Sequence, residues 1–135
     1  MTATTTERLT QQRASDQFDF PVAAATKILA GTIVVLNTSG NAKPGTTAAG
    51  EKAVGRAEAT VDNTSGAAGD VSVPIRRGTF LFANSAATDE ITNADYGSTC
   101  YVVDNQTVAK THATNTRSVA GVVRGVTPAG VWVEF

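Results

Sequence analysis

Residues 68–82 read AGDVSVPIRRGTFLF, and this stretch decides the fold class. In its first half, Val71, Val73 and Ile75 alternate with polar residues or proline, and a period of two residues is typical of a half-buried strand. After an Arg-Gly pair, the run from Thr79 to Phe82 predicts a second strand, because β-branched and aromatic residues dominate it. We therefore expect the two strands to form a hairpin or a bulged corner.

Pro74 sets a condition on the first of these strands. Proline has no backbone N–H to donate to a neighbouring strand, so within sheets it is found at edges or where its nitrogen faces solvent. We therefore expect this strand to lie at a sheet edge, or position 74 to point away from its neighbour.

The composition favours one β-rich domain. The chain has 135 residues, which is enough to bury a core without disulfides or metals. Thr, Ala and Val are plentiful and Leu is scarce, and this balance favours strands over long helices. Eleven Lys and Arg stand against twelve Asp and Glu with no basic block, so the charge pattern of a nucleic-acid-binding protein is missing.

The rest of the chain supplies partners for the central strands. We expect strands at 32–36, 53–61, 100–103 and 107–110, and a C-terminal hairpin that joins 118–126 to 131–135. Small residues line one side of the 53–61 strand, which indicates close approach of another strand or chain. A short helical turn is expected between Ala86 and Tyr96, with Thr92 as its N-cap and Gly97 as its end. The predicted fold is all-β, a small single-domain β-sandwich or β-barrel with an extended N-terminal arm and at most one short helix.

The first twenty residues differ from the rest. They contain runs of Thr, Gln and Ser with mixed charges, and Leu9 is the main apolar residue before Phe18. Such a segment has no core of its own, so we expect an extended arm at 1–20 and a β-rich domain at 21–135. Two interpretations of Phe18 and Phe20 stay open: they anchor the arm on a partner, or they pack against the chain's own domain.

A single cysteine limits the chemistry of the chain. Cys100 cannot form an internal disulfide or a multi-thiolate metal site, and a lone cysteine fits assembly in a reducing compartment. No apolar run approaches the roughly 20 residues that span a bilayer, and the N-terminus lacks the pattern of a signal peptide. We expect a protein that is made in the cytosol and binds neither membranes nor nucleic acid.

No motif indicates an enzyme. Residues 45–52 resemble a phosphate-binding loop, but Glu51 occupies the place of the lysine, where a carboxylate would repel the ligand. His112 is the single histidine and lies in a polar loop, and no nucleophile motif surrounds Cys100. The acids at 89, 90 and 95 lack the spacing of a calcium loop. We expect no catalytic residue, no cofactor and no metal.

Three residues are candidates for contacts between subunits. Arg76 and Arg77 form an adjacent basic pair that could meet a partner's carboxylates. Trp132 alternates out of phase with Val131 and Val133, so its side chain should face away from the main core. Large aromatic residues and arginines are enriched at interfaces, and we predict intersubunit contacts at Arg76, Arg77 and Trp132. Two alternatives stay open: the arginine pair is a solvated corner, and Trp132 packs on the second face of its own sheet.

Several short segments resemble the capsid cement, or head decoration, proteins of tailed bacteriophages. They are AGDV at 68–71 leading into GTF at 78–80, ADYG at 94–97, CYVVD at 100–104, VAGVV at 119–123 and GVWV at 130–133. The resemblance implies a small β-rich structural protein on the outer surface of the virion, assembled in the host cytoplasm, without enzyme activity or cofactor. Its partners would be the major capsid protein and itself, as a homotrimer that stabilises the head against the pressure of packaged DNA.

The arm suggests how such a protein would hold a capsid. We hypothesise that it clamps the capsid surface, with Leu9, Phe18 and Phe20 as apolar anchors and Arg8 and Arg13 as polar contacts. Under this hypothesis, a protein lacking residues 1–20 stays a folded oligomer and no longer binds expanded heads.

Two other functions fit the same predicted fold. A phage tail or baseplate subunit would assemble into rings or tubes instead of binding heads. A carbohydrate-binding module would need exposed aromatics in a row, for which the candidates are Tyr96, Tyr101 and Trp132.

Overall fold

The computed structural model describes all residues from 1 to 135 and contains twelve strands, two single 3-10 turns and no α-helix. The strands are β1 (Gln17–Pro21), β2 (Thr26–Ile28), β3 (Ile33–Leu36), β4 (Ala42–Pro44), β5 (Lys52–Ala57), β6 (Val61–Asn63), β7 (Ser72–Arg76), β8 (Thr79–Asn84), β9 (Thr99–Val102), β10 (Thr107–Ala109), β11 (Val119–Thr127) and β12 (Gly130–Glu134). The two turns are η1 (Ala87–Asp89) and η2 (Asn93–Asp95). The all-β prediction is therefore confirmed.

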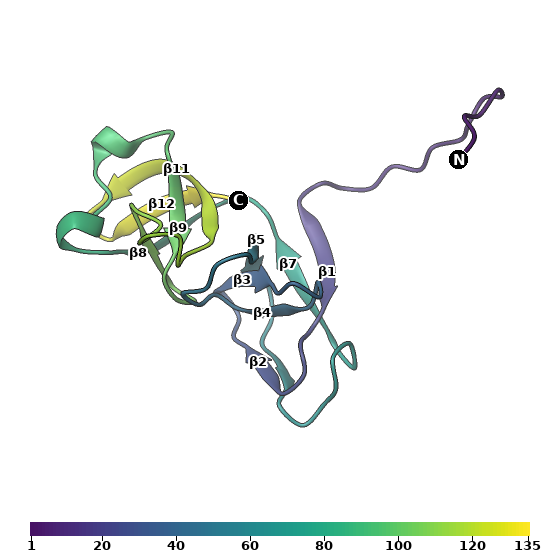
Figure 1. The fold of residues 1–135 in the computed structure, drawn as a ribbon, viewed down its shortest axis with the longest axis horizontal. Helices are drawn as coiled ribbons and strands as arrows, with labels where there is room; N and C mark the ends of the chain where they lie inside the picture. Colours follow the sequence, from purple (N-terminus) through teal and green to yellow (C-terminus); the bar gives the residue numbers. More distant parts are fainter.

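The strands form an open sheet beside a closed barrel (Figure 1). The open sheet has the order β1-β7-β5-β3-β4, and the barrel has the order β10-β8-β12-β11-β9. A separate pair, β2 and β6, lies below the open sheet in the view of Figure 1. The predicted C-terminal hairpin is present as β11 and β12, and the strands predicted at 100–103 and 107–110 are present as β9 and β10, which pair antiparallel.

Strand β3 joins the two halves of the molecule. Ile33 and Val35 belong to the barrel core, whereas Val34 belongs to a second core between the open sheet and the β2-β6 pair. All three side chains are fully buried. A strand that is buried on both faces needs a continuous apolar run, and the sequence Ile-Val-Val meets this requirement.

The central stretch forms a corner and not a hairpin. β7 pairs with β1 and β5 in the open sheet, whereas β8 pairs with β12 and β10 in the barrel. Arg77 and Gly78 carry the chain from one sheet to the other. Of the two arrangements that the sequence allowed, the corner is correct, because each strand finds its partners in a different sheet.

The expectation of an edge position for Pro74 is wrong, because β1 covers one side of β7 and β5 lies on the other. On the β5 side, the Pro74 carbonyl accepts a hydrogen bond from the N–H of Glu58 at 2.9 Å. β5 ends at Ala57, one residue before Glu58, so the ladder between β5 and β7 stops at this point. The N–H that proline lacks is therefore not needed inside the ladder.

The expected close approach at the small-residue strand is found at Gly55 in β5. A Cβ atom at this position would lie 2.3 Å from the Arg76 carbonyl oxygen in β7, and the Gly55 φ angle is +140°. Only glycine avoids both problems. The expected helical turn is also present, since Thr92 and Asp95 form a capping box at η2.

We predict that Gly55→Ala destabilises the protein strongly, because the new methyl group would push β7 away from β5. Gly50 is a matched control, since its φ angle is +77° but no atom lies within 4 Å of a Cβ built there. Gly50→Ala should lower the free energy of unfolding by about 1 kcal/mol, from the backbone conformation alone. Gly55→Ala should lower it by at least about 2 kcal/mol more. Unfolding in guanidinium chloride measures both, and equal losses would contradict the close contact.

Candidate functional site

The most unusual feature of the molecule is its N-terminal segment. Residues 1–17 are all exposed, and the side chain of Leu9 is 97% exposed. Figure 1 shows the first residues extending far from both sheets. The side-chain hydrogen bonds of residues 1–12 are confined to Thr4 and Thr6, and neither Glu7 nor Arg8 forms an ion pair. We call residues 1–12 the free arm.

The base of the arm, residues 13–16, is attached to the domain. The Arg13 guanidinium lies over the Phe18 ring, 4.6 Å from its centroid. The backbone carbonyl of Asp16 accepts a hydrogen bond from the N–H of Arg77 at 2.8 Å, and its carboxylate pairs with Arg76 at 3.3 Å. The direction in which the free arm leaves the domain is therefore set by contacts with the corner at residues 76 and 77.

Phe18 and Phe20 are part of the folded domain. Both lie in β1, where they pair with Ile75 and Val73 of β7, and both are half-buried. Their ring centroids are 6.3 Å apart. This arrangement agrees with packing against the chain's own domain, and the exposed segment ends at Gln17, before residue 20. The other side of β1 has no neighbouring strand, so its backbone groups form an open edge.

A groove of about 420 Å³ lies where the open sheet meets the barrel, and we call it the junction groove. Its apolar lining comes from β1, β3, β5, β11 and the chain end, and consists of Phe18, Phe20, Leu36, Ala53, Val54, Ala120 and Phe135. Its charged lining consists of Arg13, Lys52, Arg77 and Glu134. Glu134 is paired with Arg124 at 2.6 Å, whereas the three cations have no carboxylate partner. The apolar side chains are buried or half-buried, whereas Arg13, Lys52 and Arg77 are exposed, so the groove is apolar at its floor and positive at its rim.

The junction groove brings together four of the residues singled out from the sequence, Arg13, Phe18, Phe20 and Arg77. Sequence reasoning missed Lys52, Leu36 and Phe135, which come from three other segments. No local pattern marks these residues, because only the docking of the sheet against the barrel places them side by side.

Arg76 points to a different environment from Arg77. Its guanidinium pairs with Asp16 at 3.3 Å and with Glu58 at 3.4 Å, and Glu58 also binds Arg56 at 2.6 Å. Arg56, followed by Arg76, lowers the pKa of Glu58. Exposed ion pairs contribute little stability. Arg76 therefore has its charge matched within the chain, whereas Arg77 does not.

Trp132 faces outward from the barrel, as its phase in the sequence predicted. Its side chain is 40% exposed, whereas Val131 and Val133 on either side are fully buried. Leu81 of β8 lies opposite Trp132 and is 39% exposed. These two side chains form an apolar pair on the outer barrel wall, and neither lines the junction groove.

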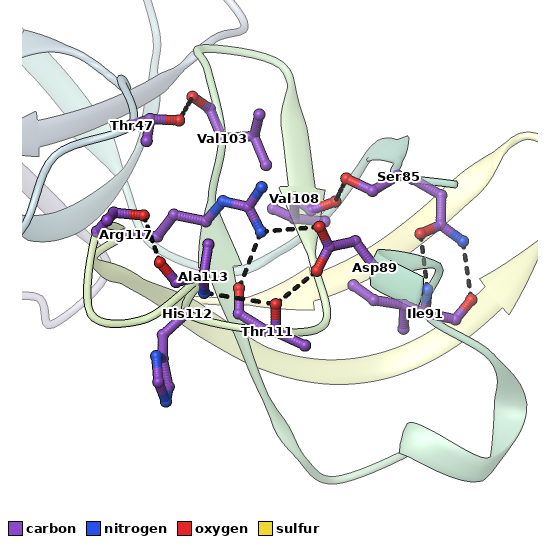
Figure 2. Close-up of polar contacts among 12 residues, drawn as sticks. Thr47, Ser85, Asp89, Ile91, Val103, Val108, Thr111, His112, Ala113 and Arg117 are labelled. Atoms are coloured by element: carbon purple, nitrogen blue, oxygen red, sulfur yellow. Dashed lines mark hydrogen bonds and ion pairs between the residues drawn. The ribbon is translucent and has the colours of Figure 1, made fainter. Parts of the chain in front are cut away.

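His112 lies in a surface loop that side-chain contacts hold in place (Figure 2). The imidazole is exposed, and its Nδ1 accepts a hydrogen bond from the N–H of Asn115 at 2.9 Å. Asp89 fastens the loop, because its carboxylate binds the Thr111 hydroxyl at 2.5 Å and Arg117 at 3.2 Å. None of the three cavities of the molecule is lined by His112.

Cys100 lies inside the barrel core. Burial raises the pKa of its thiol to about 11, so the thiolate that a nucleophile or a metal ligand needs is rare at neutral pH. No cluster of three or more His, Cys, Asp or Glu side chains could hold a metal ion. None of the helical segments has the length or apolar character needed to cross a membrane.

The Asp89 contacts predict a pH dependence of stability. The Thr111 hydroxyl, followed by Arg117, lowers the pKa of Asp89 below its ordinary value of 3.8. A lowered pKa means that these contacts stabilise the fold above the unfolded-state pKa, and that the stabilisation is lost as the pH falls through the folded-state pKa. We expect Asp89→Asn to be less stable than the wild type at neutral pH, and the two to converge at the acidic end. Denaturant unfolding across this range measures the difference, and Glu90→Gln, at an exposed residue without an ion pair, should match the wild type throughout.

Comparisons with protein-family models, with curated proteins and with solved structures found no match to this chain.

Proposed function

We propose that this protein is a structural component of a bacteriophage virion that binds the outside of the capsid, cements neighbouring capsid subunits and thereby stabilises the head. The observation that carries the proposal is the free arm, in which residues 1–12 project from a compact all-β domain without packing against it. The resemblance of segments between residues 68 and 133 to capsid cement proteins supports the same function. In this role the protein holds neighbours together and transforms no substrate.

The energetics of the arm support a binding role. Ordering a chain segment costs about 1–2 kcal/mol per residue, so the free arm stays loose until a partner supplies hydrogen bonds and apolar contacts. The open edge of β1 lies next to the arm base and offers a further strand position. A capsid surface with an exposed strand can be joined by strand addition at such sites.

Contacts between copies would strengthen this attachment. Several arms on one homotrimer multiply modest individual affinities through effective concentration. Among the predicted intersubunit residues, Trp132 is the best placed, because it pairs with Leu81 on an open outer wall. Arg76 is already neutralised by Asp16 and Glu58, so it has less charge to offer a partner.

The experiment is a truncation that removes the free arm and nothing else. Deleting residues 1–20 would also remove most of β1 and expose the edge of β7, so the truncation should end after Gln12. We expect the protein lacking residues 1–12 to keep its fold, because those residues make no contact that the domain needs. Its binding to expanded heads should fall at least about tenfold, measured by co-pelleting, because the arm contacts are lost.

The control for this truncation is Leu29→Ser in the full-length chain, at an exposed leucine outside the arm. This variant should bind heads as the wild type does. Undiminished head binding by the truncated protein would contradict the clamp. Rings or tubes formed in the absence of heads would instead assign the protein to a tail or baseplate.

A further inference from the structure

The chain carries an unpartnered apolar side chain and an unpartnered apolar groove. Leu9 is 97% exposed in the free arm, and Glu7, two positions before it, has no cationic partner. The junction groove has an aromatic floor, and its rim carries Lys52 and Arg77 without anionic partners. The groove thus offers an apolar surface for Leu9 and cations for Glu7.

The spacing of the two arm residues suits an extended segment. In a strand, side chains two positions apart point to the same side and are separated by roughly 7 Å. Glu7 and Leu9 therefore face the same way when the arm is extended. With Leu9 on the groove floor, Glu7 is positioned to reach a cation at the rim.

The arm is poorly suited to enter the groove of its own chain. Arg13 already lines that groove, and only Thr10, Gln11 and Gln12 separate it from Leu9. Returning Leu9 to the same groove requires the chain to reverse within these three residues. None of them is a Gly, Pro, Asn, Asp or Ser, the residues that dominate tight turns. An arm that continues outward without reversing reaches the groove of another copy instead.

We propose that the junction groove of one copy binds the free arm of a second copy, with Leu9 on the apolar floor and Glu7 paired with Arg77 and Lys52. Each copy then gives one arm and receives one, either in a reciprocal pair or around a closed ring. Leu9 is four positions from Arg13, which is held against its own domain, so the neighbouring groove must lie within about 13 Å of Arg13. This inference concerns contacts between copies in the absence of a capsid, to which the proposed function assigns the same arm.

The first test is a charge exchange in the full-length chain without heads. Glu7→Arg and Arg77→Glu each place like charges at the proposed contact, and each should weaken self-association at least about tenfold, a range expected for close charge pairs. The double variant restores opposite charges and should regain association. Sedimentation equilibrium measures the mass against the 13.9 kDa of one chain. Both residues are exposed, and near-ultraviolet circular dichroism checks that the barrel stays folded.

The outcomes of this first test are decisive in either direction. Loss in both single variants with recovery in the double variant supports arm exchange. A wild-type chain that stays monomeric at high concentration, single variants that associate as the wild type does, or a double variant that does not recover would overturn it.

A second test uses the arm as a peptide. A labelled peptide of residues 1–12 should bind the protein that lacks those residues, and fluorescence anisotropy measures the affinity. A peptide carrying Leu9→Asp should bind at least about tenfold more weakly, because an apolar contact is replaced by a charge. Equal affinity of the two peptides, or no binding by either, would contradict the proposal. Failure here together with arm-dependent head binding would leave the cement function standing and place the arm on the capsid.

Discussion

Burial of β3 on both faces is the constraint on which the rest of the structure depends. Its side chains alternate between two cores, with Ile33 and Val35 in the barrel core and Val34 in the core above the β2-β6 pair. Neither core closes without this strand. A polar residue at any of these positions would leave one core with an unsatisfied buried group, a cost of about 1–3 kcal/mol. The open sheet and the barrel are therefore one packed unit, with the junction groove between them.

The corner at Arg77 and Gly78 determines which charged and apolar side chains lie at the junction groove. Because the chain changes sheets here, the end of β7, the arm base and the barrel wall meet at one place. Asp16 is held by the backbone of Arg77 and the side chain of Arg76, which directs the free arm away from the domain. The Arg77 guanidinium is left without a carboxylate at the groove rim. An attached base and an exposed arm thus lie next to each other.

This combination suits a protein that connects other molecules. A groove formed by packed elements needs little ordering when it binds, whereas the arm must be ordered. A single arm therefore binds weakly, and several arms acting together bind more tightly. Here Cys100 is enclosed in the barrel core and His112 lies in a surface loop away from the three cavities. The position of the arm supports assembly as the proposed task.

Local pattern was enough to predict strands, their inward faces and some ends. The period of two at residues 71–75 and the opposite phases of Trp132 and Val133 identify buried sides, because side chains alternate along a strand whatever its neighbours are. Thr92 could be predicted as a cap because capping depends on residues three positions apart. Which strands pair with each other could not be predicted, since the same periodicity is compatible with a hairpin and with a corner.

Only tertiary structure decided that β7 and β8 belong to different sheets, that β1 covers the edge beside Pro74, and that segments far apart in the chain line one groove. These features depend on contacts between residues far apart in the chain. The sequence alone determined which residues prefer to be buried; the docking of sheet against barrel decided which of them meet.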